Sequence, residues 1–245
     1  MTTRIGSRIA PTIVFLHGGA INRQMWIPVM DLLADDFDCL AIDLPGHGAQ
    51  MDVPFTMGAA RQRLADALDE IGVEQAALVG LSLGGYVALD FTRESPEKVR
   101  GLVLSGATVT YTGWAGLSTW LYGWAFPMVA RKAVKAFAEK LQSDLSKDQA
   151  RQVLDVGLSM RGGGTALRKL PGTDYAAHID SSVIPIVIAN GERDTPNRSG
   201  EAQFLKRHPR TIVIVIEDAG HACAIQQPVA FARAVRVLMA EATDS

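Results

Sequence analysis

The stretch Ala76-Ala77-Leu78-Val79-Gly80-Leu81-Ser82-Leu83-Gly84-Gly85 decides the fold of this chain. A short apolar run leads into the pattern G-x-S-x-G, and a segment of helical period, Leu83–Arg93, follows it. A serine on a sharp strand-to-helix turn exposes its Oγ at a helix N-terminus, where N–H dipoles favour negative charge. Glycines on both sides let the backbone pack closely around such a turn. We therefore predict that Ser82 is a nucleophile; the alternative is a structural serine that only caps the helix.

Similar apolar runs alternate with helical segments along most of the chain. The runs are continuous, as in parallel strands that are buried on both faces. They cover Thr12–Leu16, Cys39–Asp43, Ala76–Gly80, Gly101–Ser105, Ile184–Asn190 and Thr211–Glu217, and the helical segments cover Trp26–Ala34, Met57–Ile71, Leu83–Arg93, Gly200–Arg207 and Val229–Glu241. This alternation predicts an α/β fold with a mostly parallel sheet of about six to seven strands flanked by helices.

The alternation breaks once, between residues 107 and 179. This stretch contains helical patterns at Phe126–Leu141 and Asp148–Met160 and then a glycine run at Gly162–Gly164, without a convincing buried strand. It is too long for a plain connection. We therefore expect a core domain made of residues 1–106 and 180–245, with a helical cap inserted at residues 107–179.

A serine nucleophile needs a base, and His221 is the best placed of the five histidines. It follows the last predicted strand, at the carboxyl end where open α/β sheets place their ligand sites. Asp194 follows the preceding strand and is the expected acid, which would accept a hydrogen bond from His221 Nδ1 and fix its tautomer. Glu192 is the rival acid, but it directly follows Gly191 and is expected to point to solvent.

An oxyanion hole requires two backbone N–H donors near the Oγ of Ser82. We expect one from Leu83, the residue after the nucleophile. The other is expected from Gly19, in the loop His17-Gly18-Gly19 that follows the first predicted strand, with Ala20 as the alternative. His17 itself is expected to hold this loop in place rather than to act as an acid.

These motifs resemble those of the α/β-hydrolase superfamily, and the resemblance covers nearly the whole chain. The motifs that carry it are, in order, the first strand with His17-Gly-Gly19, Asp43-Leu-Pro-Gly-His-Gly48, Gly80-Leu-Ser-Leu-Gly-Gly85, Gly191–Asp194 and Gly220-His221. The resemblance implies a Ser–Asp–His triad, a helical cap, and no cofactor and no metal. One departure is that few residues precede Thr12, so we expect the family's usual first β-hairpin to be truncated or absent.

The resemblance further implies hydrolysis of a carboxylic ester through an acyl-enzyme. Two alternatives share the triad: Gly-Leu-Ser-Leu-Gly-Gly is similar to the enol-lactonases, and Asp-Leu-Pro-Gly-His-Gly is similar to the pyruvate-eliminating synthase (a lyase) of menaquinone biosynthesis. Haloalkane dehalogenases and epoxide hydrolases are disfavoured, because both need an aspartate where Ser82 stands. An alternative of another class is a receptor-like binding protein that keeps the fold and turns over slowly.

Aromatic residues cluster at the start of the expected cap. Trp114, Trp120 and Trp124 are the candidates for lining the substrate pocket, which predicts a small or medium, apolar or aromatic ester or lactone as substrate. The alternative is that these rings pack on the main domain. Another set, Arg131, Arg161 and Arg168, could bind a substrate carboxylate, with surface placement as the alternative for each.

Composition excludes several classes of partner. The net charge of −2 and the scattered Lys and Arg argue against nucleic acid. No run approaches the roughly 18 apolar residues of a membrane span, and residues 1–11 lack the apolar core of a secretory signal, so we expect a cytoplasmic protein. The two cysteines, Cys39 and Cys223, are too few for a disulfide framework, and neither is expected to be a nucleophile. The oligomeric state stays open.

Overall fold

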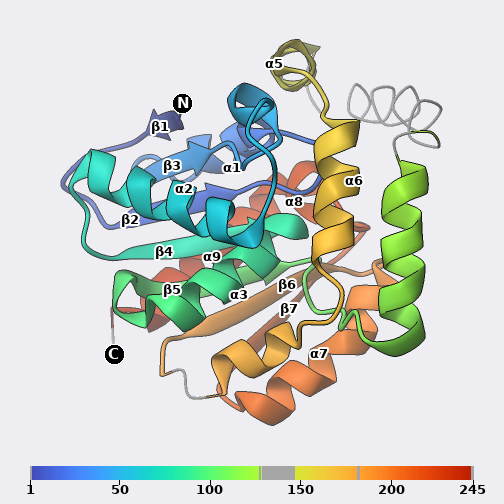
Figure 1. The fold of residues 1–245 in the computed structure, drawn as a ribbon. Coiled ribbons are helices and arrows are strands. Elements are labelled where there is room, and N and C mark those ends of the chain that lie inside the picture. The colour runs from blue at the N-terminus through green and yellow to red at the C-terminus, as the bar shows by residue number, and fades with distance from the viewer. Residues whose placement is uncertain (1, 127, 129–146, 181–182, 244–245) are drawn as a thin grey trace.

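The computed structural model describes residues 2–126, 128, 147–180 and 183–243 of the chain. Its centre is a seven-stranded sheet in the order β1-β3-β2-β4-β5-β6-β7 (Figure 1). The strands are β1 (Thr2–Ile5), β2 (Thr12–Leu16), β3 (Asp38–Ile42), β4 (Ala76–Leu81), β5 (Val99–Ser105), β6 (Ile186–Gly191) and β7 (Ile212–Ile216). All neighbours are parallel except β1 and β3. The prediction of an α/β fold with a mostly parallel sheet is confirmed.

The sheet begins with a single antiparallel edge strand. Residues of β1 pair with β3 in a register that runs from Thr2↔Ile42 to Ile5↔Cys39. Because β3 lies between β1 and β2 in the sheet, these first two strands do not form a hairpin. Among the described residues, β1 is thus a single short strand at the edge of the sheet.

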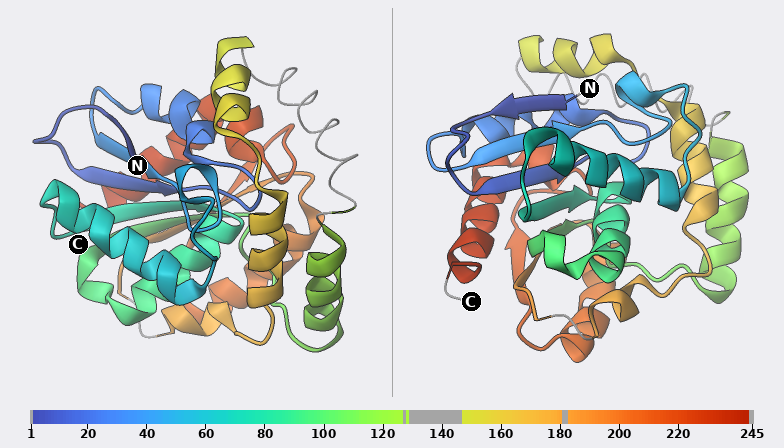
Figure 2. Two further views of the ribbon diagram at one scale, coloured as in Figure 1. Left: turned by 45° about the horizontal axis from the view of Figure 1, so that its top comes forward. Right: turned by 60° about the vertical axis from the view of Figure 1, so that its left-hand side comes forward.

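The central strands contribute side chains to two separate apolar clusters, one on each face of the sheet. In β2, Phe15 belongs to one apolar cluster and Leu16 to the other, because side chains alternate across a strand. The first face is covered by α1 (Ile27–Asp31), α8 (Cys223–Gln226) and α9 (Pro228–Glu241), and the second by α2 (Met57–Ile71), α3 (Leu83–Glu94) and α7 (Thr195–Arg207) (Figures 1 and 2). A sheet covered on both faces explains why its strands are continuous apolar runs.

The helices of the core lie where the sequence predicts them, with shifts at their ends. The helix α2 has the predicted bounds, whereas α7 begins at Thr195 instead of Gly200. Pro196 lies in the first turn of α7, where its missing N–H costs no intrahelical hydrogen bond. The polar start of this helix carries little apolar periodicity, which is why sequence reasoning began it too late.

Helices also fill the connection between β5 and β6. Residues 113–126 are helical, and α5 (Lys147–Val156), α6 (Met160–Lys169) and the 3₁₀ turn η4 (Tyr175–Ile179) follow among the described residues. The described part of the connection contains no strand, as the sequence predicts. Beyond its first positions, the helix expected at Phe126–Leu141 lies outside the described residues.

One expectation for this connection was wrong. The sequence pattern predicted a helix at Asp148–Met160 and placed the glycine run Gly162–Gly164 after it. In the structure α5 ends at Val156, next to Gly157 with a φ of 91°, and the glycine run forms the middle of α6. Interior glycines disfavour a helix by about 1 kcal/mol each relative to alanine, so tertiary packing has overridden local propensity here.

Close backbone approach explains the glycines of α6. A Cβ on Gly162 would lie 2.2 Å from the carbonyl oxygen of Gly46, and a Cβ on Gly163 would lie 3.0 Å from the nitrogen of Ala20. Ser159 ties the same junction, because its N–H donates to the carbonyl of Ala20 at 3.0 Å and its hydroxyl to that of Gly46 at 2.5 Å. The start of α6 is therefore fastened to two loops of the core.

Candidate active site

Ser82 occupies a strained turn between β4 and α3. Its φ of 51° and ψ of −113° lie outside the regions that residues with a side chain ordinarily adopt. Its N–H donates to the carbonyl of Ser105, the last residue of β5, at 2.7 Å. A Cβ on Gly84 would lie 2.1 Å from the carbonyl oxygen of Leu16, so only glycine lets α3 begin this close to β2. The strand–turn–helix context predicted for Ser82 is present.

His221 and Asp194 lie in contact just beyond the ends of β7 and β6. The Nδ1 atom of His221 is 2.8 Å from Oδ2 of Asp194, whose side chain is 6% exposed, whereas that of His221 is 52% exposed. The imidazole packs on Gly106, where a Cβ would lie 2.6 Å from Cε1. Gly106 directly follows Ser105, which holds the backbone of Ser82. The carboxyl ends of the parallel strands thus bring the predicted nucleophile, base and acid to one edge of the sheet.

Burial and hydrogen bonding act in opposite directions on the pKa of Asp194. Burial raises the pKa of this carboxyl, but hydrogen bonds from His221 and Asn197 outweigh burial, and the net pKa lies below its ordinary value. An ionised Asp194 favours the tautomer of His221 that carries hydrogen on Nδ1, which leaves Nε2 as an acceptor. The rival carboxylate, Glu192, accepts instead from the backbone N–H of Asp218 at 3.2 Å on the surface.

The loop after β2 lies against the turn that contains Ser82. A Cβ on Gly18 would lie 3.5 Å from the side chain of Leu81, and the next residue, Gly19, is exposed. Leu83 is the first residue of α3, and first-turn N–H groups have no partner within their own helix. Both predicted oxyanion donors, Gly19 and Leu83, therefore belong to segments that pack on each other beside the turn.

His17 is buried under this loop and holds it in place. Its Nδ1 lies 2.8 Å from the carbonyl oxygen of Gly18, and its Nε2 accepts from the N–H of Leu44 at 3.0 Å. Burial and then the neighbouring His47 lower the pKa of His17 to about 3, so its imidazole is neutral at physiological pH. The geometry agrees with the structural role expected from the sequence.

The chain is similar to known proteins over most of its length. A family model described as the alpha/beta hydrolase family matches residues 13–234. The chain belongs to the alpha/beta hydrolase family. It is 26% identical over 237 residues to the pimeloyl-[acyl-carrier protein] methyl ester esterase of Nitrosomonas europaea, with 90% of this chain and 92% of that protein covered. Identity to the esterase of the same name from Neisseria meningitidis serogroup B is 31% over 249 residues, with 91% of each chain covered.

A solved structure shows the same fold. The enol-lactonase from Burkholderia xenovorans LB400 superposes with a TM-score of 0.81 at 17% identity, and the match covers 98% of this chain and 96% of that one. At this level of identity the likeness concerns the fold of the alpha/beta hydrolase and does not extend to its substrate.

Sequence reasoning missed two asparagines that flank Asp194, the predicted acid. Asn190, at the end of β6, accepts from the N–H of Gly106 at 2.8 Å through Oδ1. Asn197, in the first turn of α7, donates to both carboxylate oxygens of Asp194. The only signal in the sequence was an amide side chain on each side of the motif Gly191–Asp194, and such a signal is too common to be decisive.

The predicted pocket tryptophans lie on the helix over residues 113–126 and are exposed. The exposed fractions are 85% for Trp114, 42% for Trp120 and 59% for Trp124. The rings of Trp120 and Trp124 meet edge to face at 6.2 Å, and the guanidinium of Arg168 lies 4.2 Å from the centre of the Trp124 ring. A role of these three tryptophans in substrate binding stays a prediction.

Phe126, on the same helix, contacts the glycine of α6 that packs on the predicted oxyanion loop. Its Cε1 would be 2.9 Å from a Cβ on Gly163, the glycine that packs on Ala20. Among the candidate arginines, Arg168 donates to a backbone carbonyl of that helix, and Arg161 lines a cavity of about 540 Å³ beside the start of α6. Arg131 lies outside the described residues.

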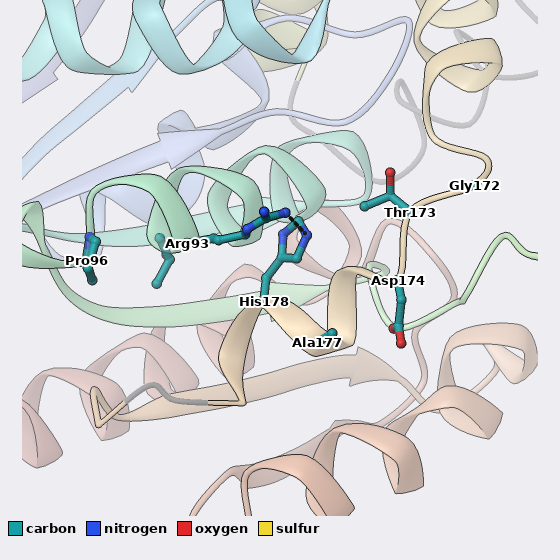
Figure 3. A pocket seen from close by; sticks show the side chains of 8 residues that line it. Arg93, Pro96, Gly172, Thr173, Asp174, Ala177 and His178 are labelled. Carbon is teal, nitrogen blue, oxygen red and sulfur yellow. Dashed lines mark hydrogen bonds between the residues drawn. The ribbon is translucent and has the colours of Figure 1, made fainter.

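Another cavity, of about 610 Å³, lies beside the C-terminal end of α3, and Figure 3 shows the residues that line it. Its lining residues are Thr92, Arg93, Pro96, Gly172, Thr173, Asp174, Ala177 and His178. Arg93 lies eleven positions after Ser82 along the chain, which at 1.5 Å per helical residue amounts to about 16 Å. This cavity is therefore separate from the group formed by Ser82, His221 and Asp194.

Cys223 is unsuited to nucleophilic attack. Burial raises the pKa of its thiol to about 11, and Sγ lies 3.2 Å from the hydroxyl oxygen of Ser105. Across residues 2–126, 128, 147–180 and 183–243, no group of three or more His, Cys, Asp or Glu residues is placed to hold a metal ion. No helix in these ranges is long and apolar enough to cross a membrane.

Proposed function

We propose that this chain is a serine esterase in which Ser82 is the nucleophile, His221 the general base and Asp194 the acid that orients it. The observation that carries the proposal is the 2.8 Å contact between His221 Nδ1 and the buried carboxylate of Asp194, beside the strained turn of Ser82. Cleavage of esters as a class agrees with the two curated esterases, which align with 90% and 91% of the chain.

In the first half of the reaction Ser82 Oγ attacks the ester carbonyl carbon while Nε2 of His221 takes the hydroxyl proton. The resulting oxyanion accepts hydrogen bonds from the N–H groups of Gly19 and Leu83. Collapse of the tetrahedral intermediate breaks the bond to the alcohol, which receives the proton from Nε2. Water then attacks the acyl-enzyme by the same steps and releases the carboxylic acid.

The proposed substrate is a small or medium carboxylic ester with an apolar or aromatic group. Residues 107–179 serve as a cap over a core made of residues 1–106 and 180–245, and the aromatic side chains of the helix over 113–126 contact the apolar group. Support comes from Phe126, which packs on the glycine of α6 that touches the predicted oxyanion loop. The names of the curated relatives make a methyl ester of a dicarboxylic acid a specific substrate to test.

Labelling with a fluorophosphonate tests the nucleophile. Only a serine activated by a base attacks this reagent, so the adduct should form on Ser82 and be absent from the variant Ser82→Ala. Mass spectrometry locates the adduct. An adduct on another residue, or no adduct on folded wild-type protein, would contradict the proposed function.

Turnover of a substrate panel tests the reaction type. We expect hydrolysis of p-nitrophenyl esters and of the dicarboxylate methyl ester to exceed the opening of an enol-lactone. Faster opening of the lactone would make the protein a lactonase that uses the same triad. A labelled Ser82 without turnover of any substrate in the panel would favour the receptor-like binding protein.

A further inference from the structure

The side-chain amide of Asn197 contacts both carboxylate oxygens of Asp194. Its Nδ2 lies 3.1 Å from Oδ1 and 2.9 Å from Oδ2, and the exposed fractions of the two residues are only 4% and 6%. Oδ2 is also the oxygen that contacts Nδ1 of His221. The amide and the imidazole thus both contact Oδ2 of Asp194. Only the amide also contacts Oδ1.

Thr108 fixes the direction in which this amide points. The backbone N–H of Thr108 donates to Oδ1 of Asn197 at 3.0 Å, and the hydroxyl of Thr108 donates to the backbone carbonyl of Asn197 at 2.6 Å. A backbone N–H can only donate, so the amide atom that faces it must be the oxygen, and the NH₂ group must face Asp194. Both ends of the amide therefore have partners, and the group is held in one orientation.

The remaining titratable neighbours of Asp194 are neutral. The charge of Asp194 acts on Tyr111 and Cys223 as well as on His221. Burial raises the pKa of both the Tyr111 hydroxyl and the Cys223 thiol, so neither carries a charge at physiological pH. The donors to this carboxylate are then the imidazole of His221, the side-chain amide of Asn197 and the backbone N–H of Asn197, and only the first two depend on a side chain.

We propose that Asn197 is a positioning residue, which orients the carboxylate of Asp194 toward His221 and lowers its basicity. The inference rests on the proposed serine esterase function. Two N–H contacts across both oxygens restrict rotation of the carboxylate, and they share its charge so that it attracts an imidazolium less strongly. Asn197 acts on the reaction only through Asp194 and His221.

The substitution Asn197→Asp isolates the two donated contacts. It keeps the shape of the side chain and an oxygen for the N–H of Thr108, but it replaces the NH₂ group that faces Asp194. When neutral, the new carboxyl group can donate one hydrogen bond to Asp194, and when ionised it repels Asp194. We expect kcat to fall about 10- to 100-fold with little change in KM. The ratio of variant to wild-type kcat/KM should decrease further as the pH rises.

The substitution Asn197→Ala provides the matched comparison. It removes the side-chain donors without adding a charge, so kcat should fall, but the ratio of variant to wild-type kcat/KM should not decrease further as the pH rises. Thr108→Val removes the hydroxyl contact with Asn197 but keeps the N–H contact, and a smaller loss of kcat is expected. Thermal melting of each variant shows how much of its loss is due to unfolding.

Proton NMR of the His221 Nδ1–H resonance gives a readout that does not depend on turnover. This resonance should move in both Asn197 variants, because the carboxylate that accepts the proton has changed. Unchanged kcat and an unmoved resonance would overturn the proposal, as would losses in kcat that only follow the melting temperature. If wild-type protein neither labels at Ser82 nor turns over esters, the proposed function fails, whereas the resonance still decides the contact of Asn197 with Asp194 and His221.

Discussion

Gly106→Ala is expected to damage the reaction by moving His221. The added Cβ would lie 2.6 Å from Cε1 and 2.9 Å from Nδ1 of His221, whereas non-bonded carbon atoms rest at about 3.5–4.0 Å. The ring must therefore move by about 1 Å. Because 52% of the His221 side chain is exposed, the ring rather than the strand is free to move.

The expected magnitude has two parts. Misplacement of a reacting group by about 1 Å costs on the order of 10² in rate, so kcat should fall by about that factor. The φ of Gly106 is 60°, and a residue with a side chain in this left-handed region loses about 1–2 kcal/mol. The free energy of unfolding should decrease by that amount.

Gly72→Ala is the matched control for the backbone strain. Gly72 has a φ of 69°, but a Cβ there would meet nothing within 4 Å. Denaturant unfolding should show a similar loss of stability in both variants, while ester hydrolysis should fall only in Gly106→Ala. If Gly106→Ala retains the wild-type kcat, then the position of the His221 ring is not what the reaction requires and the reasoning is refuted.

Three other predictions test the site and its surroundings. Asp194→Asn should reduce kcat by about 10⁴ through the wrong tautomer of His221, and Glu192→Gln should have less than a tenfold effect; reversed effects in steady-state kinetics would make Glu192 the acid. Phe126→Ala should raise KM for an aryl ester roughly 10- to 200-fold and leave acetate and kcat nearly unchanged, whereas equal losses on both esters would contradict a pocket role. Wild-type protein should lose stability as the pH falls from about 6.5 toward 3, because burial depresses the pKa of His17 to about 3 and protonation then favours the unfolded chain. Denaturant unfolding at several pH values should show a shallower decline in His17→Gln, and an unchanged slope would assign the decline to other groups.

The sequence predicts the elements whose signals are local. Buried parallel strands are continuous apolar runs. Such runs predicted the bounds of β2 correctly, and they predicted those of β3, which begins at Asp38 instead of Cys39, to within one residue. The turn around Ser82 and the loops with Asp194 and His221 were found because each follows such a run. The carboxyl ends of parallel strands meet at one edge, and this rule brings residues far apart in the chain together.

Features that depend on tertiary contacts were not predictable. The contact between Asn197 and Asp194 could not be predicted, because it depends on Thr108. This residue fixes the amide of Asn197 from its other side, and it is far from both residues in the sequence. The glycines of α6 argue against a helix by propensity, and only their approach to Gly46 and Ala20 explains them. The edge strand β1 carries too few residues for a periodic signal.

The attachment of α6 limits how substrates can reach the reacting groups. A hinge motion that lifted the start of α6 would break the hydrogen bonds of Ser159 to Ala20 and Gly46, and it would pull on the loop that carries Gly19. Opening on this side would therefore distort the backbone that we propose as a donor to the carbonyl oxygen. On another side of α6, Gly123 of the helix over 113–126 packs on Gly164 and Arg168, and separating these two helices would leave the hydrogen bonds of Ser159 to the core loops unbroken. Engineering of access routes should accordingly vary that helix and leave the glycine junction intact.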